Sequence, residues 1–121
     1  MSCSVELVPV MNIEVILDRV GGDMDLLREI AAIFLEEYPG LLNEIREGLR
    51  EGNPSRVERA AHSLKGSALN FDVAVVTDPA CQLEMLGRQK RLEDAPLFLA
   101  QLEAGLGELA PELISLTEDS I

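Results

Sequence analysis

Tryptophan is missing from the sequence, and aromatic residues make up only 3% of its 121 residues. Sheets favour aromatic and β-branched side chains, whereas Leu, Ala, Glu and Arg, which recur throughout this chain, favour helices. Long hydrophobic runs are missing too, because no apolar stretch approaches the roughly 20 residues that cross a bilayer. These absences argue against a β-sandwich and a membrane-spanning protein, and we expect a soluble, all-α protein.

Positive charge and cysteine are also scarce. Lys and Arg number 10 against 22 Asp and Glu, which gives a formal net charge of -12. Nucleic acids and anionic membrane surfaces are bound by clustered cations, so we exclude nucleic acids as partners, and attachment to an anionic membrane surface is disfavoured. The two cysteines, Cys3 and Cys81, do not provide the disulfide framework of small secreted domains. The first residues also lack the features of a secretory signal, and we expect a cytoplasmic protein.

The length and the apolar content of 47% suffice for one hydrophobic core, so we expect a single domain over residues 1–121. Capping residues, glycines and prolines divide the chain into five helical segments. The expected segments run from the cap at Asn12 to Arg19, from the cap at Asp23 to the stop before Gly52, from the cap at Asn53 and Pro54 to about Phe71, from the cap at Asp78 and Pro79 to about Gln89, and from near Asp94 and Pro96 onward.

Two segments carry apolar residues at the three- and four-residue spacing of a buried helix face. These residues are Leu26, Ile30, Ile33, Phe34, Leu41, Ile45 and Leu49 in the second segment, and Leu99, Leu102, Leu106, Leu109, Leu113 and Leu116 in the fifth. We expect Pro39 to kink the second helix. Four amphipathic helices with short connections bury their stripes most simply in an antiparallel four-helix bundle, with the first segment as a short additional N-terminal helix.

The third segment contains His62, the only histidine of the chain. Its apolar stripe consists of Val57, Ala61, Leu64, Ala68 and Phe71. Each helical residue is turned by about 100° from the one before, so His62 should lie outside the core on an exposed helix face.

The neighbours of His62 suit the binding of a phosphoryl group. Lys65 and Gly66, three and four residues later, share its helix face, and Ser67 lies nearby. Lys65 offers an ammonium group, whereas Gly66, at a cost of about 1 kcal/mol relative to Ala, leaves space beside the ring. From Pro54 to Phe71 three cations, Arg56, Arg59 and Lys65, stand against one carboxylate, which predicts a cationic island around the histidine.

A metal site is the alternative for this histidine. Glu58 and His62 have the four-residue spacing of metal ligands on a helix, but a site within a bundle needs several more ligands and there is no second histidine. The sequence also contains no glycine-rich phosphate-binding loop. We therefore expect no metal, no cofactor and no ATP-binding site.

Residues 61–71, with the sequence AHSLKGSALNF, resemble the histidine-containing phosphotransfer (Hpt) domains of multistep phosphorelays, as do residues 17–23 and 34–39. The resemblance covers about residues 13–115. It implies a helical bundle in which His62 accepts a phosphoryl group, Lys65 and Ser67 assist, and Gly66 provides clearance. It also implies that Glu84, 22 residues after the histidine, hydrogen-bonds the ring. One departure is Asp72, where the family usually has glycine.

The resemblance further implies a phosphoryl carrier rather than an enzyme. His62 would take the phosphoryl group from an aspartyl phosphate on one receiver domain, as found in response regulators and hybrid sensor kinases, and pass it to another. Any Mg²⁺ would belong to the receiver, and we expect the carrier to be a monomer. Two alternatives stay open: the phosphoacceptor domain of a chemotaxis-type kinase, and a helical scaffold protein without phosphotransfer.

Overall fold

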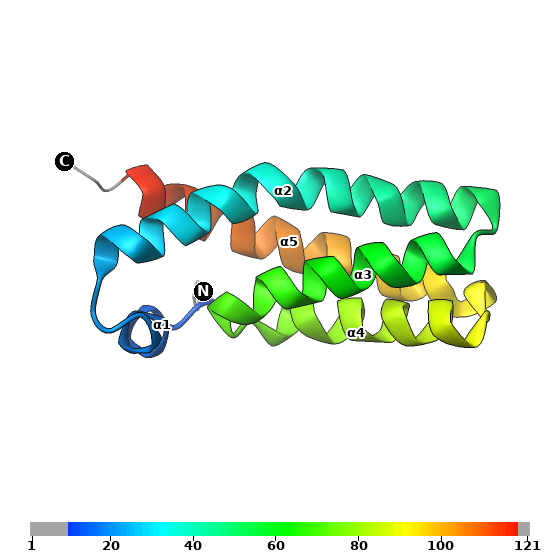
Figure 1. Cartoon of the computed structure of the whole chain (residues 1–121), viewed down its shortest axis with the longest axis horizontal. Coiled ribbons are helices and arrows are strands. Elements are labelled where there is room, and N and C mark those ends of the chain that lie inside the picture. Colours follow the sequence, from blue (N-terminus) through cyan, green and yellow to red (C-terminus); the bar gives the residue numbers. More distant parts are fainter. Residues whose placement is uncertain (1–9, 119–121) are drawn as a thin grey trace, which may run out of the picture.

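The computed structural model describes residues 10–118, and all of its regular elements are helices. The long helices are α2 (Met24–Glu51), α3 (Pro54–Ala68), α4 (Ala74–Gln89) and α5 (Ala95–Glu118), and the short helix α1 (Ile13–Arg19) lies across one end of the bundle that they form (Figure 1). Two 3₁₀ turns, η1 (Leu69–Phe71) and η2 (Leu92–Asp94), occupy connections. This arrangement confirms the predicted four-helix bundle with an additional N-terminal helix.

The long helices pack in a closed cycle around one core. α3 contacts α2 and α4, and α5 contacts the same two helices from the other side. Short connections make sequential helices antiparallel, and the largest fully buried side chains come from all four helices, from α1 and from the connections between helices. Among the described helices none is long and apolar enough to span a membrane.

The predicted caps are present at three helix starts. The side chains of Asn12, Asp23 and Asn53 accept hydrogen bonds from backbone N–H groups in the first turns of α1, α2 and α3. Gly52 ends α2 in the left-handed conformation, with φ of 67°. These local signals explain why the first three helices start where the sequence predicts. The third helix ends earlier than predicted, at Ala68 rather than near Phe71, because the chain tightens into the 3₁₀ turn η1 before Asp72.

The start of α4 differs from the prediction, which placed the cap at Asp78. The helix begins at Ala74, because the buried residues Val73 and Val76 continue the apolar face of α4 toward its N-terminus. Asp72 adopts the left-handed conformation, with φ of 53°, and separates η1 from α4. Glycine, which usually stands at this position in the Hpt domains that the sequence resembles, would adopt this conformation without the strain of a side chain.

Pro79 consequently lies inside α4 rather than at its first position. Because proline lacks an N–H, the carbonyl of Val75 receives no helical hydrogen bond from it. Gly105 of α5 packs against this carbonyl, because a Cβ atom at Gly105 would overlap with the oxygen of Val75. The glycine thus permits α5 to approach the backbone of α4 at the point where the proline interrupts the hydrogen-bond ladder.

The buried face of α2 is also narrower than predicted. Phe34 and Ile45 are buried, but Leu26 and Ile33 are 40% and 53% exposed. Ile33 precedes Phe34 by one residue, and the turn of about 100° between them directs it away from the core. The helix continues through Pro39, which is exposed to solvent.

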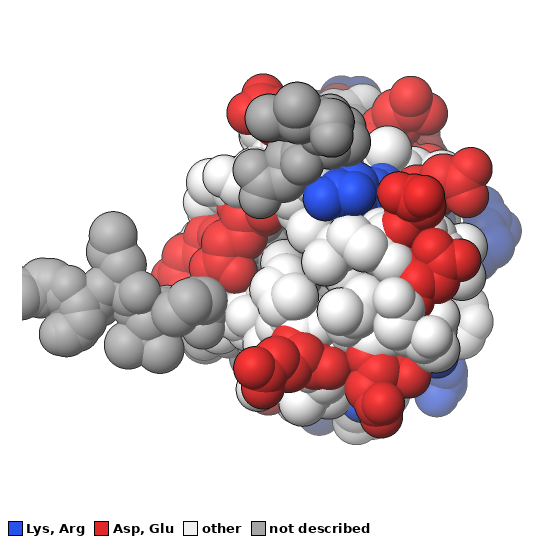
Figure 2. Space-filling view, turned by 90° about the vertical axis from the view of Figure 1, so that its left-hand side faces the viewer, with Lys and Arg blue, Asp and Glu red and all other residues white. Residues whose placement is uncertain are grey.

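Contacts from α1 and the residues before it close one end of the bundle. The backbone N–H groups of Val10 and Met11 donate to the carboxylate of Glu112 on α5, and Arg19 pairs with Asp72 at 3.6 Å. Figure 2 views this end, where acidic side chains surround a largely uncharged centre. The net negative charge of the chain is thus evident at the end of the bundle.

Candidate functional site

His62 projects from the middle of α3 with 66% of its side chain exposed. The adjacent Ala61 and the nearby Leu64 are completely buried, so the stripe predicted from the sequence faces the core. The exposure predicted for the histidine is confirmed. Its Nδ1 atom lies 2.9 Å from Oε2 of Glu84, which leaves Nε2 as the ring nitrogen that can react.

Glu84 of α4 is the centre of the polar contacts at this site. Its side chain is only 6% exposed, and its carboxylate meets three potential donors from two helices. Oε2 accepts from His62 and, at 2.9 Å, from Nη2 of Arg88. Oε1 lies 2.6 Å from Nζ of Lys65, in an ion pair that does not have the direction of a hydrogen bond. A buried carboxylate is thus surrounded by cations and an imidazole.

These contacts determine the charge of Glu84. The Lys65 ammonium holds the pKa of Glu84 below its ordinary value of 4.5, against burial, which raises the pKa, and with a smaller lowering effect from His62. Glu84 is therefore an anion at neutral pH, and a carboxylate can only accept hydrogen bonds. The proton of a neutral His62 ring must then lie on Nδ1, which leaves the lone pair on Nε2.

The pairing is mutual for Lys65 and Arg88. Glu84 raises the pKa of Lys65 above its ordinary value of 10.5. Glu58, with help from Glu84, raises the pKa of Arg88. Both cations are thus held in their charged forms by the carboxylates that they contact.

Close packing of α3 against α4 brings Glu84 to the histidine. Gly87, three residues after Glu84, lies directly against the first turn of α3. A Cβ atom there would be 2.7 Å from the carbonyl oxygen of Pro54 and 2.8 Å from the backbone nitrogen of Glu58. Only glycine allows this approach, so Gly87 supports the site without contacting the ring. Neither Gly87 nor Arg88 was predicted from the sequence, where their signals are a glycine inside a helix and an arginine one turn after Glu84.

Gly66 and Ser67 lie in different surroundings. A Cβ atom at Gly66 would meet nothing within 4 Å, so the space expected beside the histidine is present. Ser67 is half-buried and turns toward α2, where it lines a shallow groove of about 160 Å³ together with Ile33 and Asn70. The structure thus brings Lys65, Gly66 and Glu84 to the histidine, and places Ser67 on the adjoining side of α3.

A cleft of about 420 Å³ opens beside the imidazole. Its lining comes from one face of α3 and from α4, and consists of Glu58, Arg59, His62, Ser63, Glu84 and Arg88.

The cationic island predicted around His62 is smaller than expected. Arg56 binds Glu44 at 2.8 Å and Glu51 at 2.9 Å, and Lys65 binds Glu84, so two of the three cations are neutralised by carboxylates.

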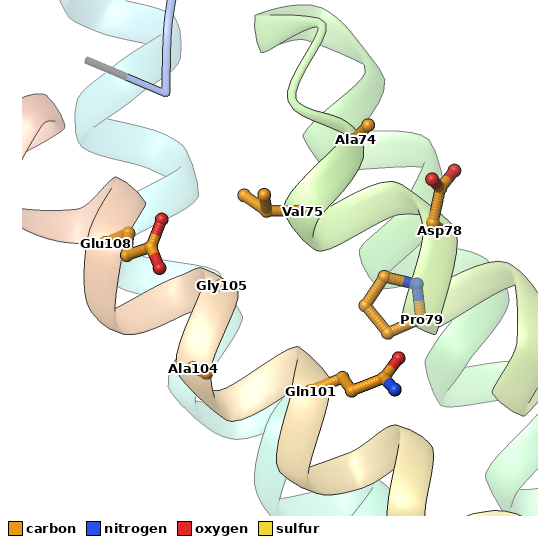
Figure 3. Close-up of a pocket in the computed structure, with 8 residues that line it drawn as sticks. All are labelled: Ala74, Val75, Asp78, Pro79, Gln101, Ala104, Gly105 and Glu108. Atoms are coloured by element: carbon orange, nitrogen blue, oxygen red, sulfur yellow. The ribbon is translucent and has the colours of Figure 1, made fainter. Parts of the chain in front are cut away.

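A second groove, of about 390 Å³, lies between α4 and α5 (Figure 3). Its lining contains the carboxylates of Asp78 and Glu108 and the amide of Gln101, and no Lys or Arg. An anionic phosphoryl group would be repelled there. Among residues 10–118, no group of three or more His, Cys, Asp and Glu side chains could hold a metal ion. The cleft beside His62 is therefore the candidate site.

Comparisons with known proteins agree on this part of the chain. Residues 29–112, which run from α2 to α5 and contain His62 and Glu84, match the model of the Hpt domain family. The fold is similar to the crystal structure of histidine-containing phosphotransfer protein B (HptB) from Pseudomonas aeruginosa PAO1, with a TM-score of 0.84 and 18% sequence identity over 94% of this chain and 99% of that chain. A sequence comparison with curated proteins finds no match.

Proposed function

Since the chain belongs to the Hpt domain family, whose members carry phosphoryl groups in phosphorelays and interact with receiver domains, we propose that His62 is its phosphoacceptor. The observation that carries this proposal is the contact of 2.9 Å between Nδ1 of His62 and the buried carboxylate of Glu84. It selects the tautomer with a lone pair on Nε2, in a ring that is two-thirds exposed. A histidine oriented in this way is a nucleophile that a partner can reach.

The transfer step follows from this geometry. Nε2 of neutral His62 attacks the phosphorus of an aspartyl phosphate on the receiver. The nitrogen–phosphorus bond forms while the phosphorus–oxygen bond breaks, and the receiver's carboxylate leaves with the electron pair. The ring keeps its proton on Nδ1 and gains a positive charge, which the anionic Glu84 stabilises. The reverse reaction delivers the phosphoryl group to a second receiver.

Exposed apolar side chains near His62 support receiver docking on this face. Leu69 lies seven residues after His62, two turns along the same side of the chain, and is 53% exposed. Ile33 of α2 is equally exposed and borders the groove that Ser67 and Asn70 line. We infer that these side chains are covered by the receiver, because large apolar side chains exposed near a reactive group are typical of an interface. Gly66 provides the clearance for that approach.

The partner supplies what the carrier's described residues do not. The Mg²⁺ that assists chemistry at an aspartyl phosphate is held by the receiver, and the carrier contributes the nucleophile and its orientation. We further propose that the carrier acts as a monomer in the cytoplasm. The identities of the donor and acceptor receivers depend on the side chains around the cleft.

Incubation with a radiolabelled, phosphorylated receiver tests the proposal. We expect an acid-labile and alkali-stable label on the wild-type chain and none on His62→Gln, which should fold normally because an exposed position changes stability by about 0.5 kcal/mol or less. The control His62→Gln separates the acceptor from any other labelled residue. A label that persists in His62→Gln, or no label from any receiver of the source organism, contradicts the proposal. Label obtained only from an ATP-binding kinase domain would favour the chemotaxis-type alternative, and none at all would favour a scaffold.

A further inference from the structure

Helices α3 and α4 carry four cations, of which Arg59 and Arg88 line the cleft. Three of the four are bound to carboxylates. Arg56 pairs with Glu44 and Glu51. Lys65 pairs with Glu84, and Arg88 pairs with Glu58 and Glu84. The charge of each of these three cations is thus largely neutralised by carboxylates of the same chain. A contact between any of them and a phosphoryl group would require breaking an existing ion pair.

Arg59 differs from these three cations. Within residues 10–118 its guanidinium has no carboxylate within ion-pair distance, and its described hydrogen bond joins Nη1 to the hydroxyl of Ser55 at 3.2 Å. A hydrogen bond to a neutral hydroxyl does not neutralise the positive charge, and the carboxylate of Glu44 interacts with it only through space. The remaining N–H groups of the guanidinium are available to an anion.

Arg59 lies in the cleft that contains the reacting nitrogen, with its guanidinium turned toward Ser55, one turn before it on α3. Arg59 precedes His62 by three residues on α3, a spacing at which side chains of a helix are neighbours. Both residues line the same cleft, together with Ser63. Lys65, in contrast, contacts the carboxylate of Glu84, which binds Nδ1 on the opposite edge of the imidazole ring. The free cation is therefore in the cleft, whereas the lysine supports the opposite nitrogen.

We propose that Arg59 is the residue that binds the phosphoryl oxygens on Nε2 of His62, a role that rests on the function proposed above. In the same proposal Lys65 is a positioning residue that acts through Glu84. A guanidinium matches phosphoryl oxygens with two parallel N–H groups and keeps its charge at any working pH. During transfer no bond to Arg59 forms or breaks. Its N–H groups donate to the phosphoryl oxygens while the phosphorus moves from the donor to Nε2.

A small phosphoryl donor distinguishes this role from receiver docking. Phosphoramidate carries a phosphoryl group on ammonia and has no protein surface, so its reaction with His62 reports only on the site. The nitrogen–phosphorus bond of the donor breaks, ammonia leaves with the electron pair and a proton from solvent, and the new bond forms at Nε2. Phosphohistidine would be followed by ³¹P NMR at saturating phosphoramidate.

We expect Arg59→Gln to lower the rate of labelling about 10-fold, because it removes a charge-assisted contact that strengthens in the transition state. Arg59→Lys should recover part of the loss. The matched control is Arg50→Gln, an exposed arginine at the end of α2 whose ion pairs involve Glu47 and Glu51 and not the cleft. It should react as the wild type does. Thermal melting of each variant establishes that it is folded.

Lys65→Gln provides the contrasting result. Removal of the lysine ammonium should raise the pKa of Glu84, which ¹³C NMR of the carboxylate measures. It should also reduce the fraction of His62 with its proton on Nδ1, which ¹⁵N NMR measures. Arg59→Gln should change neither signal. The inference is overturned if Arg59→Gln reacts at the rate of Arg50→Gln, or if Lys65→Gln slows labelling while both NMR signals stay as in the wild type. If the wild type itself forms no phosphohistidine from phosphoramidate or from receivers, the proposed function fails, an outcome distinct from the failure of Arg59 alone.

Discussion

The ammonium of Lys65 lies 2.6 Å from Oε1 of Glu84, so this lysine is bound to the same carboxylate that orients the histidine. The two residues come from α3 and α4, and each changes the ionisation of the other. The pKa of Glu84 is lowered mainly by Lys65, and the pKa of Lys65 is raised mainly by Glu84. The pair thus links the stability of the bundle to pH.

The first prediction concerns this pH dependence. Because the folded-state pKa of Glu84 is depressed, its contribution to stability is present above its ordinary pKa of 4.5 and is lost as the pH falls through the folded-state value. The raised pKa of Lys65 has the opposite sign: its contribution is present below 10.5 and is lost at higher pH. Glu84→Gln should therefore destabilise the protein by about 1–3 kcal/mol at neutral pH and by less in acid.

Thermal melting between neutral and acidic pH measures this difference. Glu36→Gln is a suitable control, because Glu36 is exposed on α2 and has no described partner among residues 10–118. It should melt as the wild type does at each pH. A constant difference between Glu84→Gln and the wild type at every pH would show that the ion pair is not the cause.

A second prediction concerns the direction of transfer. The carboxylate of Glu84 stabilises the positive charge that the ring gains on phosphorylation, and a neutral amide does so less well. Since a hydrogen bond to a charged group exceeds a neutral one by about 1 kcal/mol, Glu84→Gln should shift the equilibrium toward the phosphorylated receiver about 5-fold. The ratio of labelled carrier to labelled receiver measures the shift. Glu58→Gln, which alters a carboxylate of the same cleft that binds Arg88 rather than the ring, should leave the ratio nearly unchanged.

The third prediction tests the open space at Gly66. A leucine there should fold normally, because even a Cβ atom meets no neighbour within 4 Å, and the helix should be slightly stabilised by the loss of glycine. The side chain should nevertheless obstruct a receiver at His62 and slow transfer at least about 10-fold, a loss of about 1.4 kcal/mol. Gly107→Leu is the matched control, since Gly107 is an exposed helical glycine of α5 with the same open surroundings. Equal transfer rates in the two variants would disprove the clearance role.

A fourth prediction concerns Gly87, where a methyl group has no room. Gly87→Ala should destabilise the protein by about 1–3 kcal/mol, because the backbone atoms at 2.7 and 2.8 Å must move. The same change at Gly66 should be neutral or stabilising. Separation of α3 from α4 should also weaken the contact between His62 and Glu84 and reduce labelling by the small donor. Denaturant unfolding measures the first effect; an unchanged midpoint would mean that the two helices adjust without cost.

The sequence predicted the helices that begin with local signals. Asn12, Asp23 and Asn53 or its neighbour Pro54 mark helix starts through contacts within one turn, which depend on few other residues. The start of α4 could not be found in this way. Its extension to Ala74 depends on burial of Val73 and Val76 against other helices, and this tertiary burial outweighs the local preference of proline for a first turn.

The features of the site likewise divide into those that depend on one helix and those that depend on contacts between helices. The exposure of His62 follows from the periodicity of one helix, and the nearness of Glu84 was implied by resemblance to a family. The partner of Lys65 was not predicted, because the ion pair crosses from α3 to α4 and requires the depth to which Glu84 is buried. The free charge of Arg59 was equally hidden, since the sequence shows which residues are cations and not which of them are already neutralised by carboxylates.

The cleft at His62 also constrains the kinetics of the relay. On the function proposed above, one reactive nitrogen, on one exposed face of α3, would serve both the donor and the acceptor. Two receivers could not cover it at once, so the donor would have to dissociate before the acceptor binds, and we expect the relay through this protein to follow ping-pong kinetics. An excess of unphosphorylated donor receiver then acts as a competitive inhibitor of onward transfer. The cellular ratio of donor to acceptor receivers, and not only their affinities, therefore sets the flux through the carrier.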